Sequence, residues 1–233
     1  MKPTTSRRGP ERRSPSAPPR PPDRRPSTAA DRLTADDLPH DTLALSRALI
    51  GKLLVRVLDG ETLVGRIVET EAYFPHDPAS HAFRGRTQRN RAMFGPPLHA
   101  YVYFIYGANW CLNITSEGEG VGAAALVRAC EPVAGIATMR ALRARPSGRP
   151  RAGVVKDRDL ARGPGNLCRA FAIGPEFDGA DLTADPALWV ADDGVVLPVG
   201  VSPRIGITKA AEEPLRFYAR GNPSVSGPRA LSP

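Results

Sequence analysis

Two carboxylates stand two residues apart in the run from Ile67 to Tyr73. The alternation in this run predicts a β-strand, with Glu69 and Glu71 on the same face as Tyr73. Such a face is either solvated or forms the wall of a pocket in which one glutamate serves as a general base. Because the two carboxylates are close together, we expect the pKa of one of them to be raised, which would suit proton transfer.

An aromatic strand is predicted from Tyr101 to Tyr106, with Tyr101, Tyr103 and Ile105 on one face. A strand of this kind either packs in a core or offers ring faces on which nucleic-acid bases and cationic rings stack. Tyr106 precedes a glycine, so it can stand exposed on a turn.

Four arginines fall within eight residues in the segment that follows His81. They form either a solvated run of charge or a track for phosphate groups. They are Arg84, Arg86, Arg89 and Arg91. The four histidines of the chain lack the H-x-x-x-H and H-E-x-x-H spacings of helical zinc sites, so no metal site is predicted.

The composition is typical of one globular domain. The chain has 233 residues, of which 41% are hydrophobic and 24% charged, so it can fold without disulfides. No run of about 18 apolar residues occurs, so no membrane-spanning helix is expected, and no apolar signal segment follows the basic start. The three cysteines form no C-x-x-C pair and are predicted to be free, buried thiols. They are Cys111, Cys130 and Cys168.

Charge and proline gather at the N-terminus. Residues 1–30 hold eight of the 25 prolines and eight basic residues against two acidic ones, so most of the net charge of +8 lies there. This segment has almost no large apolar side chains that could stabilise an ordered structure. We therefore expect residues 1–35 to form a disordered Pro/Arg-rich tail, either a nucleic-acid contact or a solubility tail.

The elements that must position the candidate residues are strands alternating with short helices. A helix is predicted from Thr42 to Ile50 behind an Asp41 N-cap, and a hairpin turn at Asp59-Gly60. A long loop, 74–97, carries the four arginines, and long loops in compact domains are usually functional. Further strands are predicted at 53–58, 62–72, 101–106, 110–115, 124–129, 188–191, 204–208 and 215–220, and further helices at 132–143, 157–161 and 166–173.

This order of elements predicts an α+β fold. We expect a single mixed domain with a curved, largely antiparallel β-sheet and surrounding short helices, spanning residues 36–228. Residues 229–233 would form a C-terminal tail.

Many short runs of the chain, in the same order, resemble the alkyladenine (3-methyladenine) DNA glycosylase family. The resemblance covers roughly residues 38–228. The runs are Arg66 to Tyr73, Ser80-His81, Arg89 to Phe94, Tyr101 to Tyr103, Tyr106-Gly107, Cys111 to Asn113, Leu126 to Ala129, Lys156 to Arg158, Gly163-Pro164, Leu167-Cys168, Pro203 to Gly206 and Leu215 to Gly221.

The resemblance implies a monofunctional enzyme of base-excision repair. It would flip an alkylated or otherwise damaged purine out of duplex DNA and hydrolyse its N-glycosidic bond, leaving an abasic site. By position, Glu71 matches the family's general base, and Arg128 matches a residue near the water and the neighbouring phosphate. Tyr73, His81 and Tyr103 match residues that pack around the flipped base.

Other positions match residues that handle the duplex and the choice of base. Tyr106 matches the side chain that enters the duplex, and Asn113 matches a residue that disfavours the amino group of guanine. The four arginines of the loop are assigned to DNA contact. No site lysine is suggested, so an imine-forming lyase is not expected, and no cofactor is implied.

The chain departs from the family pattern at several positions, which bear on lesion range and affinity. Leu98-His99 stands where a glycine often precedes the aromatic strand, and Asn109-Trp110 follows the duplex-entering tyrosine where more apolar or aromatic pairs are usual. Asn166 takes the place of a basic residue, and Ser224 the place of an aromatic one.

The expected partner is duplex DNA containing damaged purines of the 3-methyladenine, 7-methylguanine, hypoxanthine and ethenoadenine class. We expect a monomer without an obligate protein partner, in the cytoplasm and associated with the nucleoid through DNA. Two other functions stay open from the residues: a non-catalytic module that binds damaged bases, and a tRNA-binding or acyl-transfer domain of similar sheet architecture.

Overall fold

One sheet of nine strands organises the protein. The structure is a computed structural model that describes residues 30–105, 107–144 and 155–228. The sheet order is β1-β7-β2-β3-β6-β5-β4, while β9 pairs with β3 and β8 with β9. The strands are β1 (Asp31–Arg32), β2 (Leu53–Leu58), β3 (Glu61–Tyr73), β4 (Ala100–Ile105), β5 (Asn109–Thr115), β6 (Ala124–Ala134), β7 (Leu188–Asp192), β8 (Val199–Ser202) and β9 (Arg216–Ala219).

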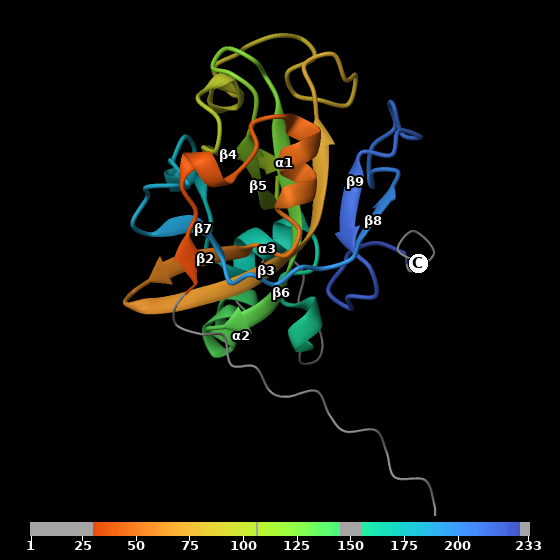
Figure 1. Cartoon of the computed structure of the whole chain (residues 1–233). Helices are drawn as coiled ribbons and strands as arrows, with labels where there is room; N and C mark the ends of the chain where they lie inside the picture. The colour runs from red at the N-terminus through yellow and green to blue at the C-terminus, as the bar shows by residue number, and fades with distance from the viewer. Residues whose placement is uncertain (1–29, 106, 145–154, 229–233) are drawn as a thin grey trace, which may run out of the picture.

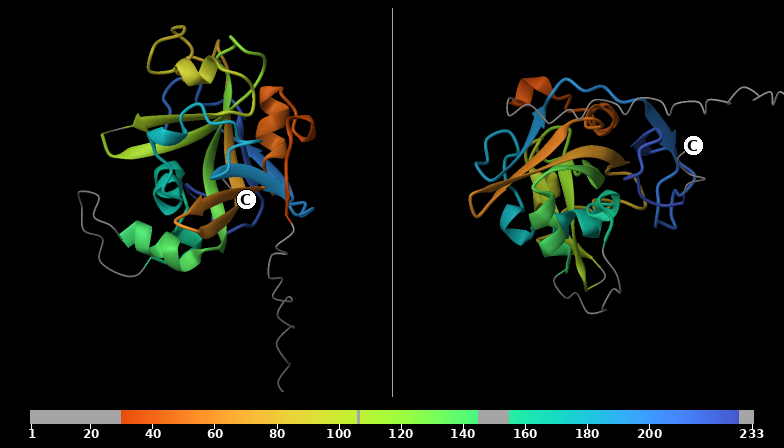
Figure 2. Two further views of the ribbon diagram at one scale, coloured as in Figure 1. Left: turned by 90° about the vertical axis from the view of Figure 1, so that its left-hand side faces the viewer. Right: turned by 90° about the horizontal axis from the view of Figure 1, so that it is seen from below.

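All of the strand pairs in the described residues are antiparallel, and helices cover parts of the sheet. The α-helices are α1 (Thr42–Ala48), α2 (Ile136–Ala144) and α3 (Pro164–Ala170). Short 3-10 helices are η1 (Ala35–Asp37), η2 (Arg91–Phe94), η3 (Asp157–Asp159) and η4 (Pro175–Phe177). In Figure 1 and Figure 2, α1 and the α2–α3 pair lie apart, with the long strands β3 and β6 between them. The expected α+β fold with a largely antiparallel sheet is confirmed.

The long strand β3 is the axis of the fold. It leaves β2 through the predicted turn, where Asp59 and Gly60 have φ of 51° and 80°, the left-handed values that a two-residue hairpin requires. Its first half runs between β2 and β6, and its second half between β6 and β9. Ile67 and Val68 at its middle are fully buried, so the strand is held on both sides and both faces.

The helix before β2 forms as its sequence predicts. Asp41 is the N-cap of α1, and its Oδ1 accepts a hydrogen bond of 2.8 Å from the backbone N–H of Ala44. Leu45 and Leu49, one turn apart, are fully buried. They attach α1 to the core beside β3 and β6.

The start of one predicted helix and the position of one predicted strand are wrong. The helix expected from Pro132 begins only at Ile136, because Pro132 still lies in β6, opposite Gly65 at a shift in register. The strand expected at 204–208 is absent, and β8 forms at Val199–Ser202 instead. Gly206 has φ of 82°, and the side chain of Arg204 is held by Asp77, so this segment turns rather than extends.

The folded part begins earlier than the boundary we expected at residue 36. Asp31 and Arg32 pair with β7, and Leu33 behind them is buried. Arg32 also lies over the ring of Trp189, 4.4 Å from its centroid. Residues 1–29 of the predicted tail and the C-terminal tail at 229–233 lie outside the described residues. In the described part, no helix is long and apolar enough to cross a membrane.

Candidate active site

The end of β3 carries both glutamates, and both are fully buried. The pairing of β3 with β6 shifts register between Ile67 and Glu69 and again between Glu69 and Thr70. At the second shift Glu69 pairs with Ala129, but the next residue, Thr70, pairs with Val127. Arg128 lies between these two partners in β6 and has no opposite residue in β3. Such irregularities redirect side chains, and here they bring the guanidinium of Arg128 to both carboxylates.

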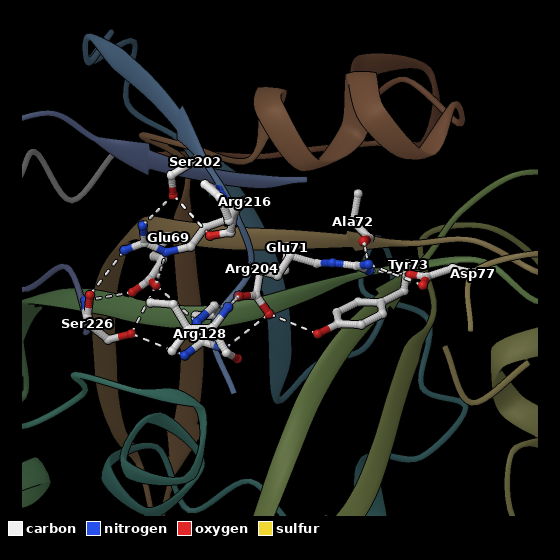
Figure 3. A network of polar contacts seen from close by, with 12 residues as sticks. Glu69, Glu71, Ala72, Tyr73, Asp77, Arg128, Ser202, Arg204, Arg216 and Ser226 are labelled. Carbon is white, nitrogen blue, oxygen red and sulfur yellow. Dashed lines mark hydrogen bonds and ion pairs between the residues drawn. The ribbon is translucent and has the colours of Figure 1, made fainter. Parts of the chain in front are cut away.

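Glu71 accepts hydrogen bonds at both of its oxygens. Its Oε2 accepts from Arg128 Nη1 at 3.0 Å and from the Tyr73 hydroxyl at 3.0 Å, and its Oε1 accepts from the backbone N–H of Ile205 at 2.7 Å. Figure 3 shows the Tyr73 hydroxyl and Arg128 converging on this carboxylate. A carboxylate has about four acceptor positions, so these three donors leave Glu71 able to accept one more hydrogen bond.

Tyr73 is held as a donor by its surroundings. Burial, and then the charge of Glu71, raise the pKa of its phenol, so the hydroxyl keeps its proton. The guanidinium of Arg204 lies over the ring, 4.7 Å from its centroid. Arg204 in turn forms a buried ion pair with Asp77 and donates to the carbonyl of Ala72 at 3.1 Å. The ring is therefore fixed on its face as well as at its hydroxyl.

Glu69 has a different environment from Glu71. Burial acts to raise its pKa, but the charges of Arg128 and Arg216 outweigh burial and hold the pKa below its ordinary value. The raised pKa that we expected from two close carboxylates is therefore not found at Glu69. The reason is that two arginines lie among the two carboxylates, so the charges balance.

Arg128 contacts both carboxylates and also lines a solvent-accessible cavity beside them. Burial would lower its pKa, but the charges of Glu71 and Glu69 raise it, so the guanidinium stays charged. It forms ion pairs with both glutamates at 3.0 Å, and it lines the cavity.

The cavity has a volume of about 440 Å³, within the range of small-molecule sites. Tyr101, Tyr103 and Ile105, the predicted face of the aromatic strand, form one wall. Other lining residues come from distant segments: Tyr73, Ala79, His81, Met93, Asn109, Cys111, Asn113, Leu126, Arg128, Pro164, Gly165, Ile205, Gly206 and Ile207. The structure thus brings Tyr73, His81, Tyr103, Asn113 and Arg128 together, while Glu71 lies behind Tyr73 and Arg128.

His81 stands edge-on to the aromatic wall. Its ring centroid is 4.4 Å from that of Tyr103, and its Nδ1 lies 2.9 Å from the hydroxyl of Tyr101. His81 is partly exposed, but the desolvation of its ring against the cavity wall, with a contribution from Arg89, lowers its pKa. The imidazole is therefore neutral near pH 7.

Asn113 and Cys111 reach the cavity from β5. The side-chain amide of Asn113 donates to the carbonyl of Tyr101 at 3.0 Å, which fixes its orientation across the β4–β5 pair. Burial raises the pKa of Cys111 to about 11, so this thiol is protonated. The prediction of free buried thiols is confirmed for all three cysteines.

The four arginines of the loop are exposed, as a phosphate track would require. Arg89 also holds the loop to the aromatic strand, because its Nη2 donates to the carbonyl of Phe104 at 2.7 Å. Tyr106 lies outside the described residues. Its neighbour Gly107 has φ of 66°, in agreement with a turn between β4 and β5.

Two departures from the family pattern have structural counterparts. Leu98, in the place of a glycine, has φ of 62°, a left-handed value that glycine adopts without strain. Asn166, in the place of a basic residue, donates a hydrogen bond of 2.7 Å to the carbonyl of Arg162, so its side chain binds the backbone of this protein.

Sequence reasoning missed the residues that support the site. Arg204, Asp77, Arg216 and Ser226 were not singled out as site residues, although all are buried and polar. Arginines inside otherwise apolar runs, as in Arg216-Phe217-Tyr218-Ala219, were the available signal. Among the described residues, no group of three or more His, Cys, Asp or Glu side chains forms a potential metal site.

Comparison with known proteins assigns the chain to a family. Residues 36–223 match the family model of methylpurine-DNA glycosylase. A protein of Mesorhizobium japonicum, provisionally named 3-methyladenine DNA glycosylase, is 50% identical over 200 residues, which are 85% of this chain and 92% of that protein. The DNA-3-methyladenine glycosylase of Homo sapiens is 46% identical over 205 residues, which are 84% of this chain and 68% of the human protein.

These relatives share one class of activity: they are named as DNA glycosylases. The chain belongs to the methylpurine-DNA glycosylase family. It is thus an enzyme of DNA repair, a monofunctional glycosylase that acts on DNA.

Proposed function

We propose that the enzyme flips damaged purines out of duplex DNA, holds the base in the aromatic cavity and hydrolyses its N-glycosidic bond. The substrates would be 3-methyladenine, 7-methylguanine, hypoxanthine and ethenoadenine. The observation that carries this proposal is the junction of the cavity with the buried carboxylates, where Tyr73 and Arg128 both line the cavity and both donate to Glu71.

In the proposed reaction, Glu71 is the general base. It accepts a proton from a water, whose oxygen forms a bond to the sugar carbon C1′ while the bond from C1′ to the purine nitrogen breaks. The electron pair of that bond leaves with the base. A positively charged alkylated purine becomes neutral as it departs, whereas a neutral lesion such as hypoxanthine departs as an anion and takes up a proton from water. The carboxylate also stabilises the cationic character that the sugar gains on the way.

The cavity supports a role in selecting the base. Tyr73, His81 and Tyr103 would pack around the flipped purine, since aromatic faces bind bases and attract cationic rings. Asn113, oriented by its bond to Tyr101, would disfavour the exocyclic amine of guanine. Extrusion costs less for a poorly paired damaged base, which adds to the selectivity.

DNA contacts are proposed for residues outside the cavity. The exposed Arg84, Arg86, Arg89 and Arg91 would bind phosphates of the backbone. Tyr106 would enter the duplex where the base has left and prevent it from stacking back. We further propose that the folded residues, from Asp31 to residue 228, act as a single domain and as a monomer without an obligate protein partner. Sedimentation with and without DNA tests the oligomeric state.

The test is release of free base. Purified protein is incubated with duplexes that carry each lesion, and abasic sites are counted. Glu71→Gln should bind the lesion duplex as the unaltered protein does and lose turnover by 100-fold or more, on the order of a lost general base. Glu131→Gln, on β6 and hydrogen-bonded to Asn222, is the matched control and should cut normally.

Binding of lesion duplex without any base release by the unaltered protein would favour the non-catalytic module. Near-normal single-turnover rates in Glu71→Gln would remove Glu71 from the role of base. Competition by tRNA in preference to duplex DNA would support the tRNA-binding alternative.

A further inference from the structure

Glu69 is a buried carboxylate for which the proposed reaction has no direct use. Its Oε1 accepts from Arg128 Nε at 3.0 Å, from Arg216 Nε at 2.7 Å and from the Ser226 hydroxyl at 2.9 Å. Its Oε2 accepts from the backbone N–H of Ser226 at 2.6 Å. Glu69 does not line the cavity. Its effect on chemistry must therefore pass through another residue.

That residue is Arg128. Its planar guanidinium spans the site, with Nε on Glu69, Nη1 on Glu71 and Nη2 near the Ser226 hydroxyl at 3.4 Å (Figure 3). Because the fork of an arginine is rigid, a bond at Nε fixes the direction of Nη1. Arg128 lies at an irregularity of β6, so the backbone register alone does not orient it.

The charges of the network balance. Glu69 and Glu71 are two negative charges, and Arg128 and Arg216 are two positive ones, all of them buried. The other charged or titratable groups beside Glu71 are Tyr73, which donates to it, and Arg204, which is paired with Asp77. Glu69 is thus neutralised by Arg216 and shares Arg128 with the proposed base.

We propose that Glu69 is a positioning residue, which orients Arg128 on Glu71 and, together with Arg216, sets the balance of charge around the proposed base. This inference rests on the proposed function, in which Glu71 is the general base. Its direction follows from electrostatics: a nearby positive charge favours the ionised carboxylate, and a nearby negative charge disfavours it.

The experiment measures single-turnover base release at saturating enzyme from pH 4.5 to 8. Glu69→Gln removes a negative charge, so the acid limb of the pH–rate profile should move to lower pH, by about one unit. Arg216→Gln removes a positive charge, so the limb should move to higher pH. The double variant restores the balance of charge, and its limb should return toward that of the unaltered protein.

Positioning is tested separately from charge. Glu69→Gln should also lower the plateau rate by about tenfold or more, because Arg128 loses the bond that directs it. Glu69→Asp keeps the charge and shortens the reach, so its plateau should fall while its acid limb stays in place. Glu131→Gln is the control and should change neither. Each variant is measured below its thermal midpoint, and the aspartate and Arg216 variants carry the test if Glu69→Gln does not fold.

The outcomes separate the two proposals. No base release by the unaltered protein from any lesion duplex would refute the proposed function. Normal release by the unaltered protein, with acid limbs that do not move in opposite directions in Glu69→Gln and Arg216→Gln, would overturn the role of Glu69 alone. In Glu69→Gln, a fall in plateau rate without a shift of the acid limb would show that Glu69 is only structural.

Discussion

Glu69 and Glu71 lie two residues apart on one strand, yet their partners give them different roles. Glu71 receives three hydrogen bonds and lies directly behind two residues of the cavity wall. Glu69 receives four and is enclosed by Arg128, Arg216 and Ser226. The surroundings of the two glutamates therefore differ because other segments contact them unequally. Ile205 bonds to Glu71, whereas Arg216 and Ser226 bond to Glu69.

At the residue scale, Glu69 predicts a pH dependence of stability. Its pKa is lowered in the folded protein from an ordinary value of 4.5, so its ion pairs stabilise the fold above about pH 4.5 and lose this effect as the pH falls. Glu69→Gln should reduce the free energy of unfolding by about 3–5 kcal/mol at pH 7, as for a broken buried ion pair. The difference from the unaltered protein should narrow below pH 4.5.

Urea unfolding at a series of pH values measures this difference. Glu131→Gln should show no such narrowing. A gap that stays constant from pH 7 to pH 3 would mean that Glu69 acts through shape and not through charge.

The sequence allowed some of these residues to be found and not others. The strand pattern placed Glu69 and Glu71 on one face, and the family resemblance singled out Arg128. The partners of Glu69 could not be found this way, because Arg216 and Ser226 lie 147 and 157 positions further along the chain. Local periodicity contains no information about contacts between such distant segments.

At the scale of elements, the sequence predicted correctly those features that depend only on neighbouring residues. The turn at Asp59-Gly60 and the cap at Asp41 depend on neighbouring residues only, and both form. The predictions failed where tertiary pairing decides. Pro132 would begin a helix in isolation, but the pairing of β6 with β3 continues past it.

The β4–β5 hairpin packs closely on α3, at a position that can be tested. A Cβ on Gly165 would lie 2.7 Å from Cγ and 2.8 Å from Cβ of Asn109, closer than side chains can approach. Gly165→Ala should therefore displace Asn109 from the cavity wall and cost about 1–3 kcal/mol of stability, as overpacking does. Thermal and urea unfolding measure the loss.

Two further variants make this test specific. Gly118→Ala is the control, because its Cβ would meet no atom within 4 Å, and it should unfold as the unaltered protein does. Asn109→Gly in the Gly165→Ala background removes the opposing atoms and should recover part of the loss. Equal stability of Gly165→Ala and Gly118→Ala would contradict the close packing.

At the scale of the whole molecule, the Pro/Arg-rich tail, here called the basic arm, should raise the affinity for DNA and leave the rate of the chemical step unchanged. Residues 1–29 contain eight basic and two acidic residues, while the remainder of the chain is close to neutral. Each phosphate neutralised on duplex DNA contributes roughly 0.9 to the slope of log affinity against log salt. If about half of the arm's charges contact DNA, removal of residues 1–29 should lower this slope by about 2 to 4.

The truncation ends before Asp31, because β1 and Leu33 belong to the fold. Single-turnover rates at saturating enzyme should stay unchanged. The slope is measured on undamaged duplex across a salt series for both proteins, and equal slopes would assign the phosphate contacts to the folded part instead.

The chain order of the network around the two glutamates has a consequence for protein synthesis. Both glutamates lie on β3, early in the chain, but their donors include Ile205, Arg216 and Ser226 near its end. A ribosome has therefore released the cavity strands long before it adds the groups that hold the two carboxylates. Until that segment arrives, Arg128 is the arginine that pairs with either carboxylate, and a premature stop codon ahead of Arg216 leaves Glu69 without its second arginine.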